Sequence, residues 1–542
     1  MSVLYVVLSL EHEIFVTSPM SFAKMFRITN LLRRMQHPAL VWQRHLTLGS
    51  REDPLNREMD GKFLHKVLSL VLEENLVTGV DESAKVVEFK HPRELQELLK
   101  LNVGQNSRST DEIMKVLEEV VRYSVKTTHP HFYNQLYGGI DEIGLAASWL
   151  SSALNTNQHT FEVAPVFILV EHYIIEYLVK LFGWDDGDGI FCPGGSMSNM
   201  YGMQLARHQR YPQSKATGIF GMKPLIAFTS DQAHYSFEKA ASWMGLGMNN
   251  VVAVATDSHG RMLPEALSEA VKHARKCGGE PFFVNASSGT TVLGACDPLN
   301  QLADVCEEEQ LWLHVDACWG GSAILSQKHK HLLQGIHRVD SIAWNPHKML
   351  GVPLQCSSFI VRHKGMLHEC NSANASYLFQ QDKFYDVSFD TGDKSFQCGR
   401  KVDAFKFYFL LSSHGLSEME RRVDAAFSAS EYLHDQIQTR PGFRAVLDAP
   451  QCTNVCFWYI PTCLRHQPET PEWWNRLSQV APKLKAKMVE NGELMIGYQP
   501  MPNKGLVNFL RVVNYCFPPP TKEHMDHVLD VIQRLGEEIK NL

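Results

Sequence analysis

Apolar residues recur three and four positions apart from Asp60 to about Tyr123. The stretches FLHKVLSLVLEENL and EIMKVLEEVVRYSV follow this spacing, which is the repeat of one helix face. We therefore predict a helical segment over residues 59–160. Residues 1–58 form a basic extension that we expect to be poorly ordered.

From about Phe161 the pattern changes to short apolar runs that alternate with helical stretches. Seven such runs are GIFCPGG, PLIAFTS, VVAVATD, PFFVNASSGTT, LWLHVDAC, SIAWNPHK and SSFIVR. This alternation is typical of a mainly parallel sheet covered by helices, so residues 161–415 are predicted to form a large α/β domain. The later runs NVCFWYI, LMIGYQP and VNFLRVV predict a smaller α+β domain over residues 416–542.

The bulk composition narrows the function classes. A chain of 542 residues is too long for one simple core, and its net charge of −7 argues against nucleic acid as the main partner. No segment has the length of a membrane span. The twelve cysteines are scattered without a CxxC pair, so we expect reduced thiols, no metal site and a cytoplasmic location.

The basic extension leaves one alternative location open. Its opening stretch VLYVVLSL lacks the basic start and the small-residue cleavage site of a signal peptide. The stretch MSFAKMFRITNLLRRMQ would resemble a mitochondrial transit peptide if translation began at Met20, although Glu11 and Glu13 precede it. A mitochondrial location is therefore the alternative.

One apolar run delivers a lysine to the end of a strand. The run from Ile342 to Trp344 leads into Asn-Pro-His-Lys, and strand ends are where open α/β sheets hold their active sites. A lysine whose surroundings lower its pKa is a good nucleophile, and its leading use is a Schiff base with pyridoxal phosphate. A solvated loop lysine is the alternative for Lys348 on these residues alone.

Pyridoxal phosphate also needs an anion site, an acid opposite its pyridine nitrogen and a group packed on its ring. In CPGGSMSNMYGMQLAR, two glycines with Ser196 and Ser198 precede a helical pattern, which suits a phosphate group. Asp316 ends the run LWLHVDAC, His234 follows PLIAFTS, and Thr291 lies in SSGTTVLGACDP. Each signal alone also fits a turn, a cap or a structural histidine, but their order along the chain fits the cofactor.

The chain resembles the group II pyridoxal-phosphate decarboxylases, and within them the glutamate and cysteine sulfinate decarboxylase branch. The motifs that carry the resemblance run from about Lys62 to the C-terminus: HPHFYNQL, GDGIFCPGGSMSNMY, HVDACWGG, WNPHK, YLFQQDKFYDVSFDTGDKSFQCGRK and NFLRVV. FYNQLYGG and NPHKMLGVPLQC look most like invertebrate cysteine sulfinate and aspartate 1-decarboxylases. The resemblance implies the aspartate-aminotransferase-like fold type I, with a mainly parallel seven-stranded sheet. It also implies a homodimer with active sites at its interface, to which the N-terminal helices contribute.

The resemblance assigns roles position by position. Lys348 would carry the Schiff base, Asp316 would face the pyridine nitrogen, and His234 would stack on the ring. The rest of the cofactor site would comprise Gly195, Ser196, Ser198, Thr291, Asn345 and His347. The stretch QQDKFYDVSFDTGDK resembles a mobile catalytic loop, on which Tyr385 would be the proton donor.

The substrate side of the site follows from the same resemblance. A salt bridge to the carboxylate that leaves would oppose the reaction, so Arg511 in VNFLRVV would grip the distal acid instead, with Gln135 beside it. Phe132 and Tyr137 would line the pocket. In the glutamate enzymes this stretch resembles YFNQLSTG, which has small residues where this chain has Tyr137. A shorter pocket favours cysteine sulfinate, giving hypotaurine, and aspartate, giving β-alanine.

Three alternatives remain at this stage. One methylene is worth only about 1–3 kcal/mol in a pocket, so glutamate decarboxylation to GABA stays open. Ser376 stands where aspartate-selective members often carry glutamine, which leans toward cysteine sulfinate. An aminotransferase would not need the Tyr385 loop, and a catalytically inactive scaffold would not need the full set of site residues.

Overall fold

The computed structural model describes residues 61–78, 80–103, 105 and 107–539. The basic extension over residues 1–58, including the stretch from Met20, lies outside these described residues, so its predicted disorder and targeting stay predictions. Of the helices that the structure describes, none is both long enough and apolar enough to cross a membrane.

The larger sheet has seven strands, as predicted. Its order is β2 (Asp188–Cys192), β8 (Ser357–Val361), β7 (Ser341–Trp344), β6 (Trp312–Asp316), β5 (Glu280–Ser287), β3 (Leu225–Ser230) and β4 (Val251–Val254). Strands β3 to β7 run parallel, while β8 is antiparallel to both β7 and β2. The mainly parallel α/β architecture is therefore confirmed, and the parallel strands end at one shared edge.

Helices cover both faces of this sheet, because its strands are apolar on both sides. Ile226 and Phe228 of β3 belong to one hydrophobic cluster, and Leu225 and Ala227 belong to another. The first cluster includes α7 (Pro165–Leu181), α11 (Pro264–Lys276) and α12 (Leu299–Glu309), and the second includes α8 (Gly195–Arg210), α10 (Ser236–Trp243) and α13 (Met366–Asn371). Alternate side chains along a strand point to opposite faces, so a doubly covered sheet follows from continuous apolar runs.

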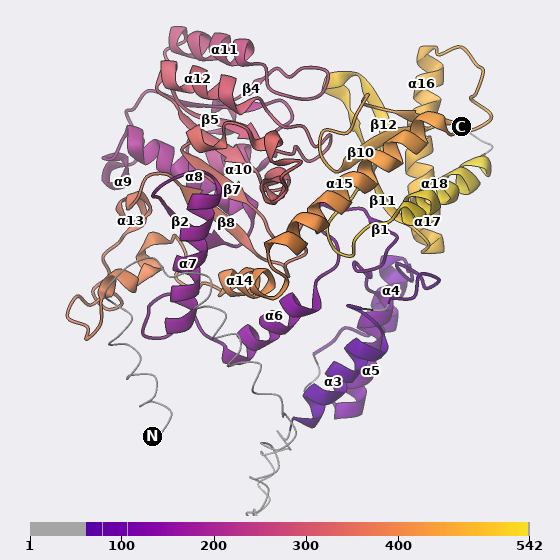
Figure 1. Cartoon of the computed structure of the whole chain (residues 1–542), viewed down its shortest axis with the longest axis horizontal. Helices are drawn as coiled ribbons and strands as arrows, with labels where there is room; N and C mark the ends of the chain where they lie inside the picture. The colour runs from indigo at the N-terminus through magenta and orange to yellow at the C-terminus, as the bar shows by residue number, and fades with distance from the viewer. Residues whose placement is uncertain (1–60, 79, 104, 106, 540–542) are drawn as a thin grey trace, which may run out of the picture. The chain divides into compact units, whose positions relative to one another are not determined.

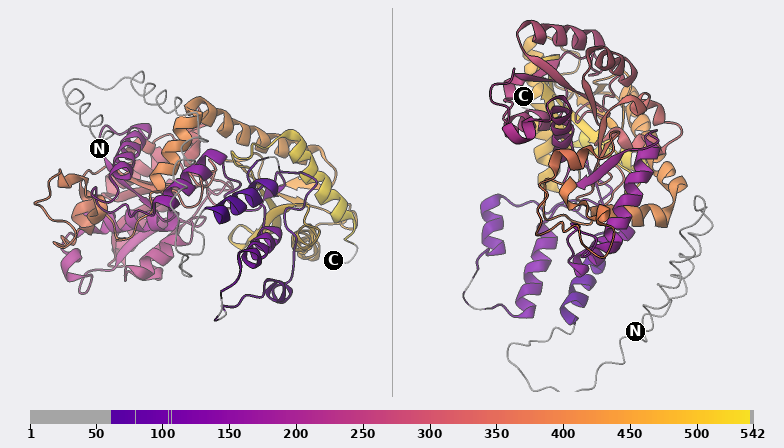
Figure 2. Two further views of the ribbon diagram at one scale, coloured as in Figure 1. Left: turned by 90° about the horizontal axis from the view of Figure 1, so that it is seen from below. Right: turned by 90° about the vertical axis from the view of Figure 1, so that its left-hand side faces the viewer.

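A second sheet has five strands in the order β1 (Phe132–Tyr133), β11 (Met495–Met501), β12 (Leu506–Val513), β10 (Asn454–Tyr459) and β9 (Phe443–Ala445). The three predicted C-terminal strands are all present. Strand β1 comes from the segment expected to be helical, and it pairs in parallel with β11. Figure 1 and the left view of Figure 2 show the two sheets in different parts of the molecule.

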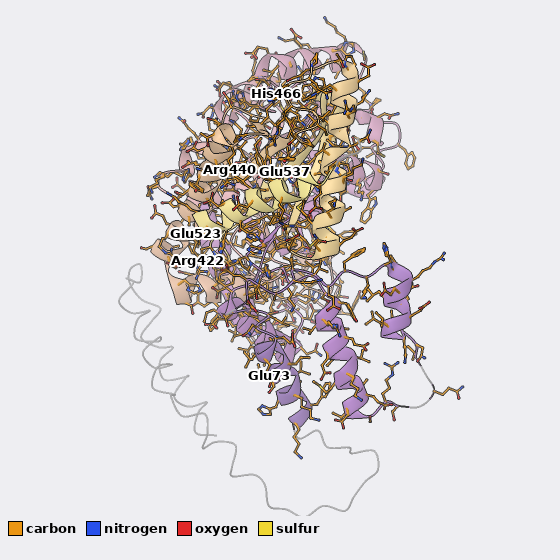
Figure 3. All side chains as sticks on the ribbon, turned by 90° about the vertical axis from the view of Figure 1, so that its right-hand side faces the viewer. Glu73, Arg422, Arg440, His466, Glu523 and Glu537 are labelled. Carbon is orange, nitrogen blue, oxygen red and sulfur yellow. The ribbon has the colours of Figure 1, made fainter. Side chains whose placement is uncertain are left out.

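Four helices accompany the second sheet: α15 (Leu416–Thr439), α16 (Pro471–Ser478), α17 (Val480–Asn491) and α18 (Lys522–Glu537). Helix α15 packs against β9, β10 and α14 (Asp403–His414). At the end of α15, Arg440 forms ion pairs with Asp526 and Asp530 of α18, the helix that carries Glu523 and Glu537 in Figure 3.

The predicted N-terminal helices are confirmed as α3 (Lys62–Glu73), α4 (Pro92–Leu99) and α5 (Thr110–Tyr123). Helix α5 begins at a capping box, in which Ser109 Oγ accepts the backbone N–H of Glu112. None of these three helices buries a side chain. Helix α6 (Glu142–Leu154) follows β1 and packs against α14.

Candidate active site

Lys348 lies in a cavity at the shared edge of the parallel strands. The strand β7 ends at Trp344, and a turn in which Lys348 N–H donates to Asn345 O (2.9 Å) places the lysine beyond the strand end. The other residues that line the cavity are Leu136, His234, Ser287, Gly289, Thr290, Thr291, Asp316, Cys318 and Trp319. Four residues predicted separately, Lys348, His234, Thr291 and Asp316, are thus brought together.

The amine of Lys348 forms no ion pair with a described residue, since no carboxylate oxygen among them lies within 4.0 Å of its Nζ. Its charge still reaches Asp316 in the same cavity wall, whose pKa it helps to lower. A structural lysine in a half-buried position is normally paired, because an unpaired charge is costly there. The amine is therefore available for a covalent partner.

The carboxylate of Asp316 is held by two donors. Its Oδ1 accepts the backbone N–H of Cys318 (3.1 Å), and its Oδ2 accepts Asn199 Nδ2 (2.8 Å). Burial raises the pKa of Asp316, but the positive charge of Lys348, the nearby His234 ring and these hydrogen bonds hold that pKa below its ordinary value. An ionised carboxylate at this position suits a protonated ring nitrogen.

His234 forms another part of the cavity wall. Its Nδ1 accepts the backbone N–H of Ser236 (3.2 Å), which leaves Nε2 as the protonated nitrogen of a neutral ring. Burial lowers the pKa of His234, while the charge of Asp316 opposes that shift. A neutral imidazole can pack on an aromatic ring without a charge penalty.

Helix α8 begins beside the cavity with an uncapped N-terminus. Gly194 precedes it with φ 111°, and no side chain caps the first backbone N–H groups. A Cβ on Gly195 would lie 2.4 Å from Cys318 Sγ and 3.0 Å from Asn345 Nδ2, so only glycine fits. Ser196 is exposed in the first turn. Free N–H groups at a helix start, where the dipole is positive, suit a phosphate.

Two predicted cofactor residues have protein partners instead. Ser198 is fully buried, and its hydroxyl lies 2.9 Å from Ser357 Oγ, which itself donates to Asn345 Oδ1 (2.5 Å). His347 is buried, and its Nδ1 accepts the backbone N–H of Cys356 (3.0 Å). These side chains join the turn after β7 to β8, so their direct contact with the cofactor stays a prediction.

Arg511 is a buried cation that pairs with no carboxylate of the described residues. It lies on β12 with 7% of its surface exposed, and its Nη1 donates to the backbone oxygen of Thr291 (2.7 Å), a residue of the cavity wall. Its Nη2 donates to Asn134 O (3.4 Å), and Nε has no partner among the described residues. Burial lowers the pKa of Arg511. A desolvated guanidinium beside the cavity suits an anionic group of a ligand.

The stretch from Phe132 to Tyr137 meets the cavity at Leu136, not at the predicted residues. Phe132 is buried in the hydrophobic core because β1 pairs with β11, opposite Met495. The ring of the half-buried Tyr137 lies 6.4 Å from that of Phe132, and Gln135 is exposed. Phe132 is not among the residues that line this cavity, because a short strand turns it into the core, so its role in the substrate pocket stays a prediction.

Tyr385 is held away from the cavity. Its hydroxyl donates to Asp390 Oδ1 (3.0 Å), and Lys383 Nζ donates to Asp390 Oδ2 (2.7 Å). Its ring lies 5.3 Å from that of Phe161. In Figure 1 the loop between α13 and α14, in orange at the lower left, lies beside α7. The structure does not bring Tyr385 to Lys348 of the same chain.

The cavity also contains residues that were not predicted. Ser287 ends β5, Gly289 and Thr290 follow it, and Cys318 and Trp319 follow β6. Their position at the carboxyl ends of parallel strands was a usable signal. Asn199, which bonds to Asp316, carried no such signal, because it lies inside α8. Across the described residues, no cluster of histidine, cysteine, aspartate or glutamate side chains could hold a metal ion.

Known proteins are similar to this chain in sequence and in fold. The family model "Pyridoxal-dependent decarboxylase conserved domain" matches residues 92–460. The chain is 50% identical over 479 residues to "Acidic amino acid decarboxylase GADL1" of Mus musculus, covering 88% of this chain and 86% of that protein. It is 48% identical over 478 residues to "Cysteine sulfinic acid decarboxylase" of Homo sapiens, covering 88% and 96%.

Among solved structures, that of mouse CSAD in apo form superimposes with a TM-score of 0.85 at 46% identity, covering 89% of this chain and 99% of that chain. The residues present fit pyridoxal phosphate: a lysine without an ion pair to any described residue, an ionised carboxylate and a neutral histidine line one cavity, and an uncapped helix start lies beside its wall at Cys318. The chain therefore belongs to the pyridoxal-dependent decarboxylases, carboxy-lyases that use pyridoxal phosphate as their cofactor.

Proposed function

We propose that this enzyme removes the α-carboxylate of a short acidic amino acid, with cysteine sulfinate giving hypotaurine and aspartate giving β-alanine. The observation that carries the proposal is Arg511, a buried guanidinium behind the cavity wall that no described carboxylate neutralises. A planar, two-point donor matches a carboxylate or a sulfinate. The names of the relatives, an acidic amino acid decarboxylase and a cysteine sulfinic acid decarboxylase, support the same class.

The preference for a short acid rests on bulk near the cavity. Leu136 lines the cavity, and the half-buried Tyr137 follows it. One methylene of extra length is worth about 1–3 kcal/mol, which corresponds to about 10–200-fold in selectivity. Glutamate, giving GABA, is the second candidate.

The chain's own residues divide the chemistry between them. When bound, pyridoxal phosphate accepts the electrons that are released as a bond at the substrate Cα breaks. Asp316 would keep the ring nitrogen protonated, and His234 would pack on the ring. The Lys348 amine would hold the cofactor. Arg511 holds the distal acid and leaves the α-carboxylate without a salt bridge, so ground-state binding does not oppose its loss.

We assign the proton that replaces the carboxylate to the hydroxyl of Tyr385. That hydroxyl is bonded to Asp390 in this chain, so the loop must leave this position before it can donate to Cα. Because Tyr385 is held away from the cavity of its own chain, we consider delivery of this proton by the Tyr385 of a second copy of the chain.

We infer that the enzyme acts as a homodimer, whose interface includes α6 and α7. Val166, Leu169 and Tyr173 form one exposed apolar face of α7, and Trp149 and Leu150 are exposed on α6. Soluble monomers rarely expose such contiguous apolar surface. The Tyr385 loop lies next to α7, so a second copy seated on this face would meet that loop.

The experiment that tests the substrate is amine formation by purified protein with added pyridoxal phosphate. Cysteine sulfinate, aspartate and glutamate are offered separately and then in competition. Hypotaurine or β-alanine with little GABA supports the proposal and ranks the two acids. GABA as the main product would contradict the short pocket. Absence of the cofactor's absorbance band would support a catalytically inactive scaffold instead.

A further inference from the structure

A chain of buried hydrogen bonds runs from Asp316 into the interior of the larger domain. Asn199 Nδ2 donates to Asp316 Oδ2 (2.8 Å), and Asn199 Oδ1 lies 3.1 Å from His314 Nε2. His314 Nδ1 lies 2.8 Å from Ser341 Oγ, which accepts Trp312 Nε1–H (2.9 Å). Asn199, His314 and Ser341 are each 0–1% exposed, so no solvent can replace these partners.

The ionised state of Asp316 fixes the direction of every bond in this chain. A carboxylate only accepts, so the amide nitrogen of Asn199 must face it and the amide oxygen must face His314. His314 Nε2 must then carry the hydrogen. Burial lowers the pKa of His314 to about 4, so the ring is neutral and Nδ1 accepts the Ser341 hydroxyl hydrogen.

The surrounding residues are shaped to hold the His314 ring. A Cβ on Gly202 of α8 would lie 2.6 Å from His314 Nδ1, so glycine is needed there. Phe283 and Phe359 stack near the ring at 5.8 Å and 6.2 Å between centroids, and Phe237 meets it at 6.1 Å. Three aromatic neighbours and two polar partners leave the ring one orientation.

We propose that His314 is a positioning residue for the cofactor: through Asn199 it holds Asp316 as an oriented anion that faces the pyridine nitrogen. It touches neither substrate nor cofactor. Without His314 the buried amide oxygen of Asn199 would have no hydrogen-bond donor, which costs more free energy than the bond itself contributes. Asn199 would also lose the partner that fixes the orientation of its amide. Outer partners of this kind change ligand affinity by about 10–100-fold in metal sites. The inference rests on the proposed role of Asp316.

The test compares two ligands and two variants of the full-length protein. The ligands are pyridoxal phosphate and its carbon analogue, in which a C–H group replaces the ring nitrogen. The variants are His314→Phe, which fills the aromatic site but donates nothing, and His314→Gln, whose amide nitrogen can replace Nε2 as the donor. Dissociation constants are measured by fluorescence as each apoprotein is reconstituted to holoenzyme.

We expect His314→Phe to bind pyridoxal phosphate about ten-fold more weakly than the wild type and to bind the carbon analogue equally well. We expect His314→Gln to recover most of the lost affinity for pyridoxal phosphate. An equal loss for both ligands, or no loss, would overturn the proposal. If the wild type itself does not prefer pyridoxal phosphate to the carbon analogue, the result contradicts the proposed role of Asp316, on which the inference about His314 rests. Ser341→Ala, which removes only the hydroxyl, should give a smaller loss with the same ligand dependence and replaces His314→Phe if that variant does not fold.

Discussion

The hydroxyl of Tyr385 donates a hydrogen bond to Asp390 Oδ1, 3.0 Å away, and Asp390 is at the same time paired with Lys383. The proposed proton donor is thus fastened within its own loop. Burial, in the main, raises the pKa of Tyr385, with the acceptor Asp390 adding to that shift, so the phenol keeps its proton until the loop moves. This favours delivery of a proton at a defined stage over exchange with solvent.

Tyr385→Phe should slow decarboxylation by about 10²–10⁴-fold, the usual contribution of a positioned acid. Proton delivery to the cofactor instead of Cα should become more frequent, so more cofactor should be lost per amine formed. The measurement is the ratio of amine to released amino form of the cofactor. A ratio equal to that of the wild type would exclude Tyr385 as the donor.

Coexpression of two impaired variants tests whether Tyr385 serves the partner's site. Lys348→Ala removes the attachment point, and Tyr385→Phe removes the donor. If the donor acts across the dimer, a mixed dimer contains one complete site and activity should reappear when the variants are coexpressed. The mixed dimer has no complete site if the donor acts within its own chain. Each variant expressed alone is the control.

The strand-end residues could be predicted from the sequence, because parallel strands end at one edge. Asp316 ends one strand, Lys348 and Thr291 follow two others, and the structure brings the three residues to one cavity. The same rule covers Ser287 and Thr290, whose residue types gave no chemical signal of their own. Asn199 could not be found in this way, because its role depends on how α8 packs over β6.

Other positions depended on contacts that local patterns do not encode. The two-residue strand at Phe132 forms only because β11, far along the chain, offers an edge, and that pairing turns Phe132 into the core. The position of the Tyr385 loop depends on Asp390 and on Phe161, which belongs to a distant segment. Neither contact produces a periodic pattern of hydrophobic residues from which it could have been predicted.

Arg511→Lys should keep the charge beside the cavity and lose the two-point geometry. We expect kcat/KM for the preferred acid to fall by about 10–100-fold, mainly through KM, because a hydrogen bond to a charged group contributes about 1.5–3 kcal/mol. Arg444→Lys is the matched control, because Arg444 is on β9 of the same sheet and pairs with Glu469 on the surface. Equal kcat/KM values for the two variants would remove Arg511 from the substrate site.

Gly195→Ala should weaken cofactor binding without changing the fold elsewhere. The added Cβ would lie 2.4 Å from Cys318 Sγ, which cannot move freely because it is buried beside Asp316. We expect the helix start to shift and the affinity for pyridoxal phosphate to fall by about ten-fold, or 1.4 kcal/mol. The affinity is measured by reconstitution of the apoprotein. Gly399→Ala, at an exposed glycine with no atom within 4 Å and no positive φ, tests general effects of glycine replacement.

The pH dependence of stability should depend on His131, which is not among the residues that line the cavity. Its ring stacks on that of His527 of α18 at 3.9 Å, and it is 6% exposed. Burial, together with the neighbouring His527, His129 and His524, lowers the pKa of His131 to about 3. Below its ordinary pKa of about 6.5 the unfolded chain takes up a proton that the folded chain refuses.

The stability that neutral His131 contributes is therefore complete above about pH 6.5 and is lost as pH falls toward 3. Between pH 7.5 and 5 the loss should be about 2 kcal/mol from this residue. His131→Phe keeps an aromatic ring against His527 but cannot titrate, so its melting temperature should fall less over this range than that of the wild type. His337→Phe, at an exposed position, is the control and should leave the pH slope unchanged. Parallel slopes for the wild type and His131→Phe would show that this stack does not set the acid sensitivity.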